Sequence, residues 1–248
     1  MNKHILIIGG TRGLGKVLVK NLLKKKYVLS VVGRTAAFSR RAHPGIVYWP
    51  YDLRHTQNIP RLISRILKAK GKLDSIVFLQ RFRGQGDAWQ GEIDVSLTAT
   101  KIIIDSAAGH FNKKGNKTIV IVSSIAGSLI VEDQPLSYHV GKAALNQMVR
   151  FYAVKLAVKG VRVNGVSPTL VLKPESKQFY LKDKGLYNLY KAVHPLNKIN
   201  TAEEVADIIE FLMHDKSRAI SGQNIVVDGA LSLQGHESLA VKLNNFGE

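Results

Sequence analysis

Short apolar runs alternate with longer amphipathic segments along most of this 248-residue chain. The runs are rich in Val and Ile and mostly lack polar alternation, which is typical of strands buried on both faces of a sheet. We therefore expect strands at residues 4–9, 27–33, 45–52, 74–80, 117–123, 161–167 and 223–228. Apolar residues recur at helical spacing between these runs, and we expect helices at residues 13–25, 57–69, 92–110, 138–158 and 201–214.

This order of elements predicts an α/β fold. Strands that alternate with helices form a parallel, doubly wound sheet with right-handed crossovers. The last expected helix carries its own start signal, because Thr201 is followed by Glu204 in the pattern of a capping box. Two polar stretches, 81–91 and 168–200, break the rhythm and are expected to be functional loops or lids. The residues after Leu233 look like an extension beyond the last strand.

The amino-acid composition excludes several kinds of chemistry but says little about the fold. The chain has no cysteine, which excludes disulfides, thiolate catalysis and cysteine-ligated metals and agrees with a cytoplasmic location. No apolar stretch reaches the ~18 residues that a membrane span needs, and the N-terminus lacks the features of a secretory signal. The formal charge is +18, from 36 Lys and Arg against 18 Asp and Glu. These basic residues are spread along the chain, so we expect a solvated basic surface and no specific nucleic-acid partner.

A glycine-rich turn, GGTRGLG, directly follows the first expected strand and opens the first expected helix. Gly9, Gly13 and Gly15 allow a tight turn and let a pyrophosphate approach backbone N–H groups at the helix start. This strand–turn–helix context predicts a dinucleotide site. The second expected strand ends at Arg34 with no acid in reach, and Arg12 lies within the turn. Arginine suits a 2′-phosphate and an acid suits a free ribose hydroxyl, so we expect NADP(H) in preference to NAD(H).

Tyr138 and Lys142 lie one helical turn apart in the stretch SYHVGKAALNQ. A free phenol, with a pKa near ~10, is poorly matched to proton transfer at neutral pH. An ammonium group one turn away favours the phenolate and brings a phenol toward the working range of a general acid–base catalyst. A tyrosine and a lysine at this spacing are common on exposed helix faces, where they usually have no catalytic role. Here the glycine turn and the paired serines of SSIAG, one expected strand earlier, favour a catalytic role for the pair.

The glycine turn, the SSIAG serines and YHVGK, in this order, resemble the short-chain dehydrogenase/reductase family over nearly the whole chain. The C-terminal half, with VRVNGVSP (161–168) and ISGQNIVVDGA (220–230), resembles the 3-oxoacyl-carrier-protein reductase-like branch. The resemblance implies a single-domain Rossmann fold over residues 1–233, with a seven-stranded parallel sheet and a C-terminal extension at 234–248. It also implies an oxidoreductase that interconverts a small carbonyl substrate and its alcohol by hydride transfer.

The resemblance implies roles for the matching residues. Tyr138 would be the acid/base that gives a proton to the carbonyl oxygen, and Ser124 would hydrogen-bond that oxygen where charge develops. Lys142 would also bind the nicotinamide ribose, and no metal is implied. The dinucleotide would contact the residues of the glycine turn, the ends of the second and third strands, the catalytic helix and the turn after the sixth strand: Gly9, Thr11, Arg12, Gly13, Leu14, Gly15, Arg34, Asp52, Leu53, Tyr138, Lys142, Pro168 and Thr169.

Two sites depart from the family pattern. Ser96, in IDVSLTAT, stands where the family has a catalytic asparagine that holds a water, and a serine can still bond a water or the backbone. Residues 78–81 replace the family's Asn-Asn-Ala-Gly turn with Phe, Leu, Gln and Arg. These departures leave an alternative open: a dinucleotide-binding protein with weak or no catalysis that acts as a regulator or scaffold.

The resemblance also places a substrate lid at about residues 170–195. This segment is rich in lysine and tyrosine. Arg81 and Arg83 are expected near the opening of the substrate site that the lid would cover. An anionic or carrier-linked substrate is therefore one hypothesis, and a merely solvated lid is its rival. The family generally assembles as dimers or tetramers through helices that match 92–110 and 138–158, which implies a homo-oligomer.

Overall fold

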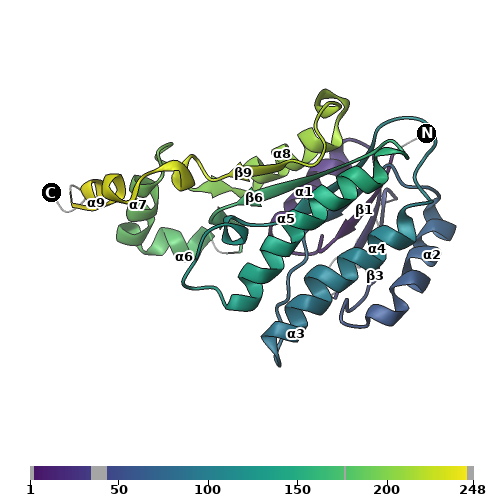
Figure 1. Ribbon diagram of the computed structural model, residues 1–248, viewed down its shortest axis with the longest axis horizontal. Helices are drawn as coiled ribbons and strands as arrows, with labels where there is room; N and C mark the ends of the chain where they lie inside the picture. The colour runs from purple at the N-terminus through teal and green to yellow at the C-terminus, as the bar shows by residue number, and fades with distance from the viewer. Residues whose placement is uncertain (1–2, 35–43, 176, 245–248) are drawn as a thin grey trace.

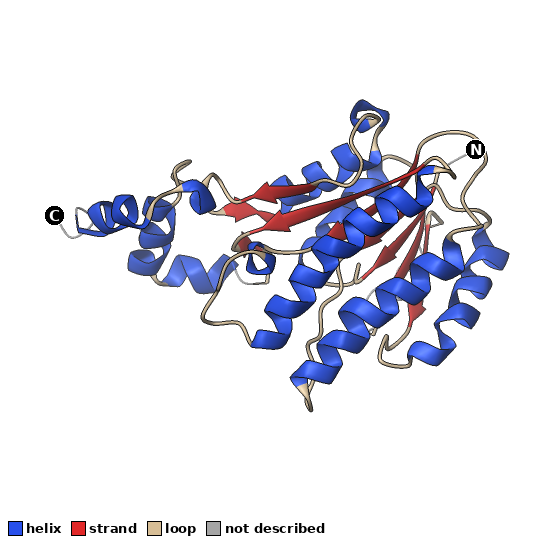
Figure 2. Cartoon of the chain, viewed as in Figure 1, coloured by secondary structure: helices blue, strands red, loops and turns tan. Residues whose placement is uncertain are grey.

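The computed structural model describes residues 3–34, 44–175 and 177–244. Seven strands form one sheet in the order β3-β2-β1-β4-β5-β6-β9, and every neighbouring pair is parallel (Figures 1 and 2). The predicted α/β fold with a seven-stranded parallel sheet is confirmed. The strand order reverses between β1 and β4, and doubly wound sheets bind ligands at the carboxyl ends of strands at such a switch point.

The strands of this sheet follow the expected apolar runs closely. Every residue of β1 (His4–Ile8) and β4 (Ser75–Phe78) is buried, as expected for central strands that are covered on both faces. The other strands of the sheet are β2 (Val28–Gly33), β3 (Ile46–Pro50), β5 (Lys117–Val122), β6 (Val161–Pro168) and β9 (Asn224–Val227). The sequence pattern does not predict a small second sheet, in which β7 (Val171–Leu172) pairs with β8 (Asn200–Thr201).

Helices cover both faces of the sheet (Figure 1). One layer contains α1 (Gly13–Lys24) and α8 (Ala202–Met213), whose apolar side chains share a core with β1 and β2. The other layer contains α2 (Ile59–Lys70), α4 (Ala99–Ala107) and α5 (Leu136–Ala157). The expected capping box is present at the start of α8. Short 3-10 helices are η1 (Thr56–Asn58), η3 (Ile125–Gly127), η4 (Asp215–Ser217) and η5 (Leu231–Leu233).

The segment expected as a helix at 92–110 is a continuous helical run with a π-helical centre. α3 (Ala88–Glu92) leads into the six-residue π-helix η2 (Ile93–Thr98) and then into α4. The run begins earlier than expected because the side chain of Asp87 accepts hydrogen bonds from backbone N–H groups of its first turn. Single π-helical turns are frequent at functional sites, and this one carries Ser96.

The stretch 168–200, expected to be irregular, contains two helices besides the β7–β8 pair. These are α6 (Lys177–Lys182) and α7 (Lys184–Val193). The side chain of Asp183 caps α7 by accepting a hydrogen bond from a backbone N–H of its first turn. The segment therefore has regular structure that its polar, lysine-rich sequence does not reveal.

The extension after residue 233 also contains a helix, α9 (His236–Asn244), which packs against α7. The side-chain amide of Gln234 connects them by donating to the carbonyl oxygen of Val193 at 2.8 Å. Figure 1 shows α6, α7 and α9 together beyond one end of the sheet. The last part of the extension, 245–248, lies outside the described residues. In the part of the chain that the structure describes, no helix could cross a membrane and no group of three or more His, Asp or Glu residues could hold a metal ion.

Candidate active site

The site residues predicted from the sequence gather at the carboxyl edge of the sheet. Gly9 follows β1, Ser124 follows β5 and Thr169 follows β6, while Tyr138 and Lys142 lie in the first two turns of α5. The carboxyl ends of parallel strands share one edge, so these segments meet although they are far apart in the sequence. The strand arrowheads of β6 and β9 point toward α6 and α7, so these helices lie at this same edge (Figures 1 and 2).

The turn between β1 and α1 leaves no room for side chains. A Cβ atom on Gly15 would lie 2.3 Å from the carbonyl oxygen of Gly9, and one on Gly9 would lie 2.8 Å from the backbone nitrogen of Gln80. Gly9 also has a φ of +83°, a conformation that favours glycine. The start of α1 is therefore held close against β1 and the end of β4, with the helix's first N–H groups lacking helical partners.

The segment after β7 brings an anion to this helix start. The backbone N–H of Gly13 donates to Oε1 of Glu175 at 3.0 Å, and this bond holds the pKa of Glu175 below its usual range. The side chain of Lys173 passes over the same turn, since its Cδ would lie 3.1 Å from a Cβ on Gly13. A dinucleotide phosphate at this helix start would need the same N–H group. The residues present thus fit an anionic cofactor, which would displace Glu175 from Gly13.

The ends of β2 and β3 carry the other expected cofactor contacts. Arg34 is exposed, and its Nη2 donates to the carbonyl oxygen of Arg83 at 2.6 Å, which links the end of β2 to the loop after β4. Asp52 follows β3 and forms an ion pair with Arg54, with 2.7 Å between Oδ2 and Nη2. The hydrogen bond from Arg54 lowers the pKa of Asp52, and the charge of Arg34 adds to this shift. Leu53 is buried next to Asp52.

Tyr138 is half-buried between two cations. Its ring centre lies 5.3 Å from Nζ of Lys142 and 4.6 Å from the guanidinium carbon of Arg81. Lys142 is only 3% exposed, and its ammonium donates to the carbonyl oxygen of Val122 at 3.3 Å. Burial lowers the pKa of Lys142 to about 8, while the negative charge of Glu92 opposes this shift and nearby cations add to it. The structure therefore places the phenol and the ammonium side by side, as the spacing of the two residues predicts.

The paired serines lie against the same part of α5. Oγ of Ser123 donates to the carbonyl oxygen of Lys142 at 3.0 Å. Oγ of Ser124 accepts the N–H of Ala126 at 3.2 Å and lies 3.5 Å from the carbonyl oxygen of Pro168. Ser124 is thus held where the start of α5 meets the end of β6.

A buried carboxylate lies beside Ser96. Oγ of Ser96 is fully buried and donates to Oε1 of Glu92 at 2.5 Å, so its partner is an acid and not the backbone. Oε2 of Glu92 accepts the backbone N–H of Phe82 at 3.1 Å. Glu92 also packs against Gly141, where a Cβ would lie 2.9 Å from its Cγ. The acid therefore lies next to the α5 backbone that carries Lys142.

Glu92→Gln is expected to lower the pKa of Lys142 further, below its value of about 8, because an opposite charge nearby favours the protonated amine. The amide keeps the size of the side chain and removes only its charge. NMR titration of the ε-carbon of Lys142, assigned by the loss of its signal in Lys142→Met, measures the midpoint. Asp94→Asn, which changes an acid bonded to Gln90 on the same helical run, is the matched control. Equal midpoints in wild type and Glu92→Gln would show that Glu92 does not act on Lys142.

Sequence reasoning misses three residues at this edge. Glu92 lies four residues before Ser96, and this one-turn spacing is the signal that could have revealed the pair. Glu175 and Arg54 give no comparable signal. Glu175 reaches Gly13 only through the folding of the lid, and Arg54 is one of many basic residues in the chain.

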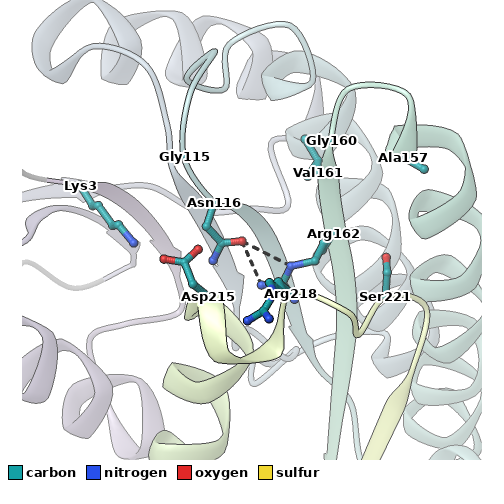
Figure 3. Close-up of a pocket in the computed structure, with 10 residues that line it drawn as sticks. All are labelled: Lys3, Gly115, Asn116, Ala157, Gly160, Val161, Arg162, Asp215, Arg218 and Ser221. Carbon is teal, nitrogen blue, oxygen red and sulfur yellow. Dashed lines mark hydrogen bonds between the residues drawn. The ribbon is translucent and has the colours of Figure 1, made fainter.

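A surface hollow of about 550 Å³ lies at the opposite edge of the sheet (Figure 3). Arg162 crosses it, and Nη2 of this residue donates to Oδ1 of Asn116 at 3.1 Å and to the carbonyl oxygen of Leu212 at 2.9 Å. These bonds tie the amino ends of β5 and β6 to the end of α8. We interpret the hollow as structural, because doubly wound sheets bind ligands at their carboxyl edge.

Comparison with known proteins agrees with this geometry. A family model described as enoyl-(acyl carrier protein) reductase matches residues 11–232. A tropinone reductase homolog from Arabidopsis thaliana is 34% identical over 93% of this chain and 91% of its own length. Two solved structures, ElxO with NADP bound and 4-hydroxyisoleucine dehydrogenase complexed with NADH, have TM-scores of 0.83 and 0.84 at 24% and 23% identity. Each covers 94% of this chain and aligns over 100% of its own length. The chain therefore belongs to the short-chain dehydrogenase/reductase family of NAD(P)-dependent oxidoreductases.

Proposed function

We propose that this protein reduces a carbonyl to an alcohol with NADPH, or runs the reverse reaction with NADP+, and that Ser124, Tyr138 and Lys142 form its active site. One observation carries the proposal: the Tyr138 ring lies 5.3 Å from the Lys142 ammonium at the same edge of the sheet as the glycine turn. A phenol beside a buried cation is suited to proton transfer, and proton transfer must accompany carbonyl reduction.

The residues divide the work as follows. When bound, the dinucleotide supplies or accepts the hydride. Tyr138 gives its hydroxyl proton to the carbonyl oxygen during reduction and takes it back during oxidation. Lys142 stabilises the phenolate that remains, and Glu92 helps to keep Lys142 protonated. Ser124 donates a hydrogen bond to the substrate oxygen as negative charge develops there.

The dinucleotide would lie along the carboxyl edge. Gly13 supports the placement of its phosphates, because the Gly13 N–H already bonds a carboxylate. Gly9 and Gly15 supply the backbone cradle, with Thr11, Arg12 and Leu14 between them, and Pro168 and Thr169 would flank the nicotinamide end. Since ElxO was solved with NADP and 4-hydroxyisoleucine dehydrogenase with NADH, the shared fold does not decide between the cofactors. Arg34 and Arg12, both exposed at this edge, support NADP(H).

Arg34→Ala is expected to weaken NADPH binding by about 10- to 100-fold, because a hydrogen bond to a charged group contributes about 1.5–3 kcal/mol. NADH lacks the 2′-phosphate, so its dissociation constant should change by no more than about twofold. Fluorescence titration of both cofactors measures the effect. Arg61→Ala, which removes an exposed arginine of α2, is the matched control. Equal weakening of NADPH and NADH would argue that Arg34 does not bind the 2′-phosphate.

A panel of carbonyl compounds tests the reaction itself. Neutral aldehydes and ketones, short oxo acids and carrier-linked oxoacyl groups are each mixed with the protein and NADPH, with NADH in parallel, and cofactor absorbance is followed. We expect oxidation of NADPH with at least one class and slower oxidation of NADH. Tight NADPH binding without turnover of any class would favour a dinucleotide-binding regulator or scaffold instead. The observation that favours this second function is Ser96, which stands in the asparagine position and is bonded to Glu92.

A homo-oligomer, either a dimer or a tetramer, is also part of the proposal. The outer face of α5 supports it, because Phe151, Val154 and Val158 are 58%, 79% and 90% exposed. Exposed apolar faces of this kind are typical of protein–protein contacts. The cytoplasmic location, the lack of a specific nucleic-acid partner and the 3-oxoacyl-carrier-protein reductase-like branch stay predictions.

A further inference from the structure

Cationic side chains crowd the edge of the sheet around Tyr138. Partial desolvation and the charges of Arg81 and Arg12 lower the pKa of Arg83. Burial and the charges of Arg83 and Arg81 likewise lower the pKa of Lys173. These groups therefore lie close enough to repel one another, and an anion among them would relieve the repulsion.

Two of these cations, Arg81 and Arg83, form no ion pair with the nearby acids in the part of the chain that the structure describes. Glu92 is bonded to Ser96 and to the backbone of Phe82, and Glu175 is bonded to Gly13. Among residues 3–34, 44–175 and 177–244, no carboxylate lies within ion-pair distance of Arg81 or Arg83. Arg81 and Arg83 thus carry positive charge that no ion pair within the described residues compensates.

These cations lie at two different places, one near the expected dinucleotide phosphates and one at Tyr138. Lys173 lies over Gly13 at the start of α1, which is the side of the dinucleotide phosphates. Arg81 lies instead on the ring of Tyr138, with its guanidinium carbon 4.6 Å from the ring centre. Its Nη2 donates to Oε1 of Gln134 at 3.2 Å, which fixes the guanidinium plane, while its buried Nε has no hydrogen-bond partner. Beyond the bond to Gln134, the terminal N–H groups of this guanidinium can donate to a ligand, and an arginine fork suits a carboxylate or a phosphate.

We infer that Arg81 binds an acidic group of the substrate, a carboxylate or a phosphate a few bonds away from the carbonyl that Tyr138 protonates. The inference rests on the proposed function and names its substrate class. A carbonyl oxygen bonded to the Tyr138 hydroxyl and an anion bonded to Arg81 each lie about 3 Å from their donors. Because Arg81 stacks on the Tyr138 ring itself, one small molecule can reach both groups. Arg81 is therefore a residue that determines specificity.

Two measurements on the full-length protein test this assignment. The first compares kcat/KM with NADPH for a short 2-oxo or 3-oxo carboxylate, a phosphorylated ketone and the neutral methyl ester of the same oxo acid. The second measures, by calorimetry, binding of the oxo carboxylate to the protein saturated with NADP+, which cannot reduce it. In wild type we expect one of the anionic compounds to exceed the ester by about 10- to 100-fold, and the better anion identifies the source of the acidic group.

Arg81→Met keeps an unbranched apolar stem and removes the guanidinium with its charge. It should remove most of the preference for the anion, weaken anion binding to the NADP+ complex by at least about tenfold, and lower kcat/KM for the anion by at least about tenfold more than for the ester. Arg150→Met, which removes an exposed arginine of α5, should change none of these quantities. Equal kcat/KM for anion and ester in wild type, or equal loss for both in Arg81→Met, would overturn the inference and leave carbonyl reduction standing. A wild-type protein that oxidises NADPH with neither anion nor ester, and whose NADP+ complex binds no oxo carboxylate, would overturn both.

Discussion

Tyr138→Phe is expected to lower kcat for carbonyl reduction by roughly 100- to 10,000-fold, which is the usual contribution of a positioned proton donor. Phenylalanine keeps the ring between Lys142 and Arg81 and removes only the hydroxyl group. The loss should therefore fall on the chemical step. NADPH oxidation under saturating substrate measures kcat, and fluorescence titration should give an NADPH dissociation constant within about threefold of wild type, since one lost neutral hydrogen bond costs little.

The matched control is Tyr27→Phe, which removes a phenol just before β2, at the opposite end of the sheet. Its kcat should equal that of wild type. If Tyr138→Phe kept more than a tenth of the wild-type rate, Tyr138 would not be the proton donor, and the phenol would have to be assigned a structural role against α5 and the loop after β4.

Lys142→Met is expected to lower kcat at neutral pH by about 100-fold or more, because it removes the positive charge beside the Tyr138 ring. Methionine has similar length, and burial disfavours the charged form of Lys142, so the substitution removes a charge whose burial costs free energy. Lys142 is 3% exposed, so the melting temperature should stay the same or rise while activity is lost. NADPH binding should also weaken, since the family resemblance places the nicotinamide ribose on this lysine.

Lys155→Met, in the last turn of the same helix, is the control, because this lysine is exposed. It should change neither kcat nor cofactor binding. A Lys142→Met variant that melts at a lower temperature but turns over at the wild-type rate would assign Lys142 to stability alone.

The fold could be predicted from the sequence because its strands have a strong local signature. β1 and β4 are continuous apolar runs, and their complete burial is what such runs require. The lid could not be predicted in the same way. α6 and α7 are short and rich in lysine, and α7 packs against both α6 and the C-terminal helix α9, which the local sequence does not specify. The cap that Asp183 supplies to α7 is a local signal that the sequence contains, but it is outweighed by the polarity of the segment.

The residues of the candidate site likewise differ in whether a local sequence pattern reveals them. The glycine turn and the Tyr138–Lys142 pair are local patterns within single elements, so their spacing reveals them. The bond between Gly13 and Glu175 joins residues 162 positions apart, and no local pattern specifies it. The stacking of Arg81 on Tyr138 likewise depends on how the loop after β4 meets α5. Sequence therefore predicts the groups that we propose to react, while the groups that we propose to select the substrate and to compete with the cofactor emerge only from tertiary structure.

A crystal structure of the protein with NADP+ tests the central claim most directly. We predict that the phosphates occupy the start of α1, with Glu175 displaced from the N–H of Gly13, and that the nicotinamide lies within contact distance of the Tyr138 hydroxyl with its ribose on Lys142. A complex in which Glu175 keeps its bond to Gly13 at saturating NADP+, or in which the nicotinamide lies away from Tyr138, would contradict the account.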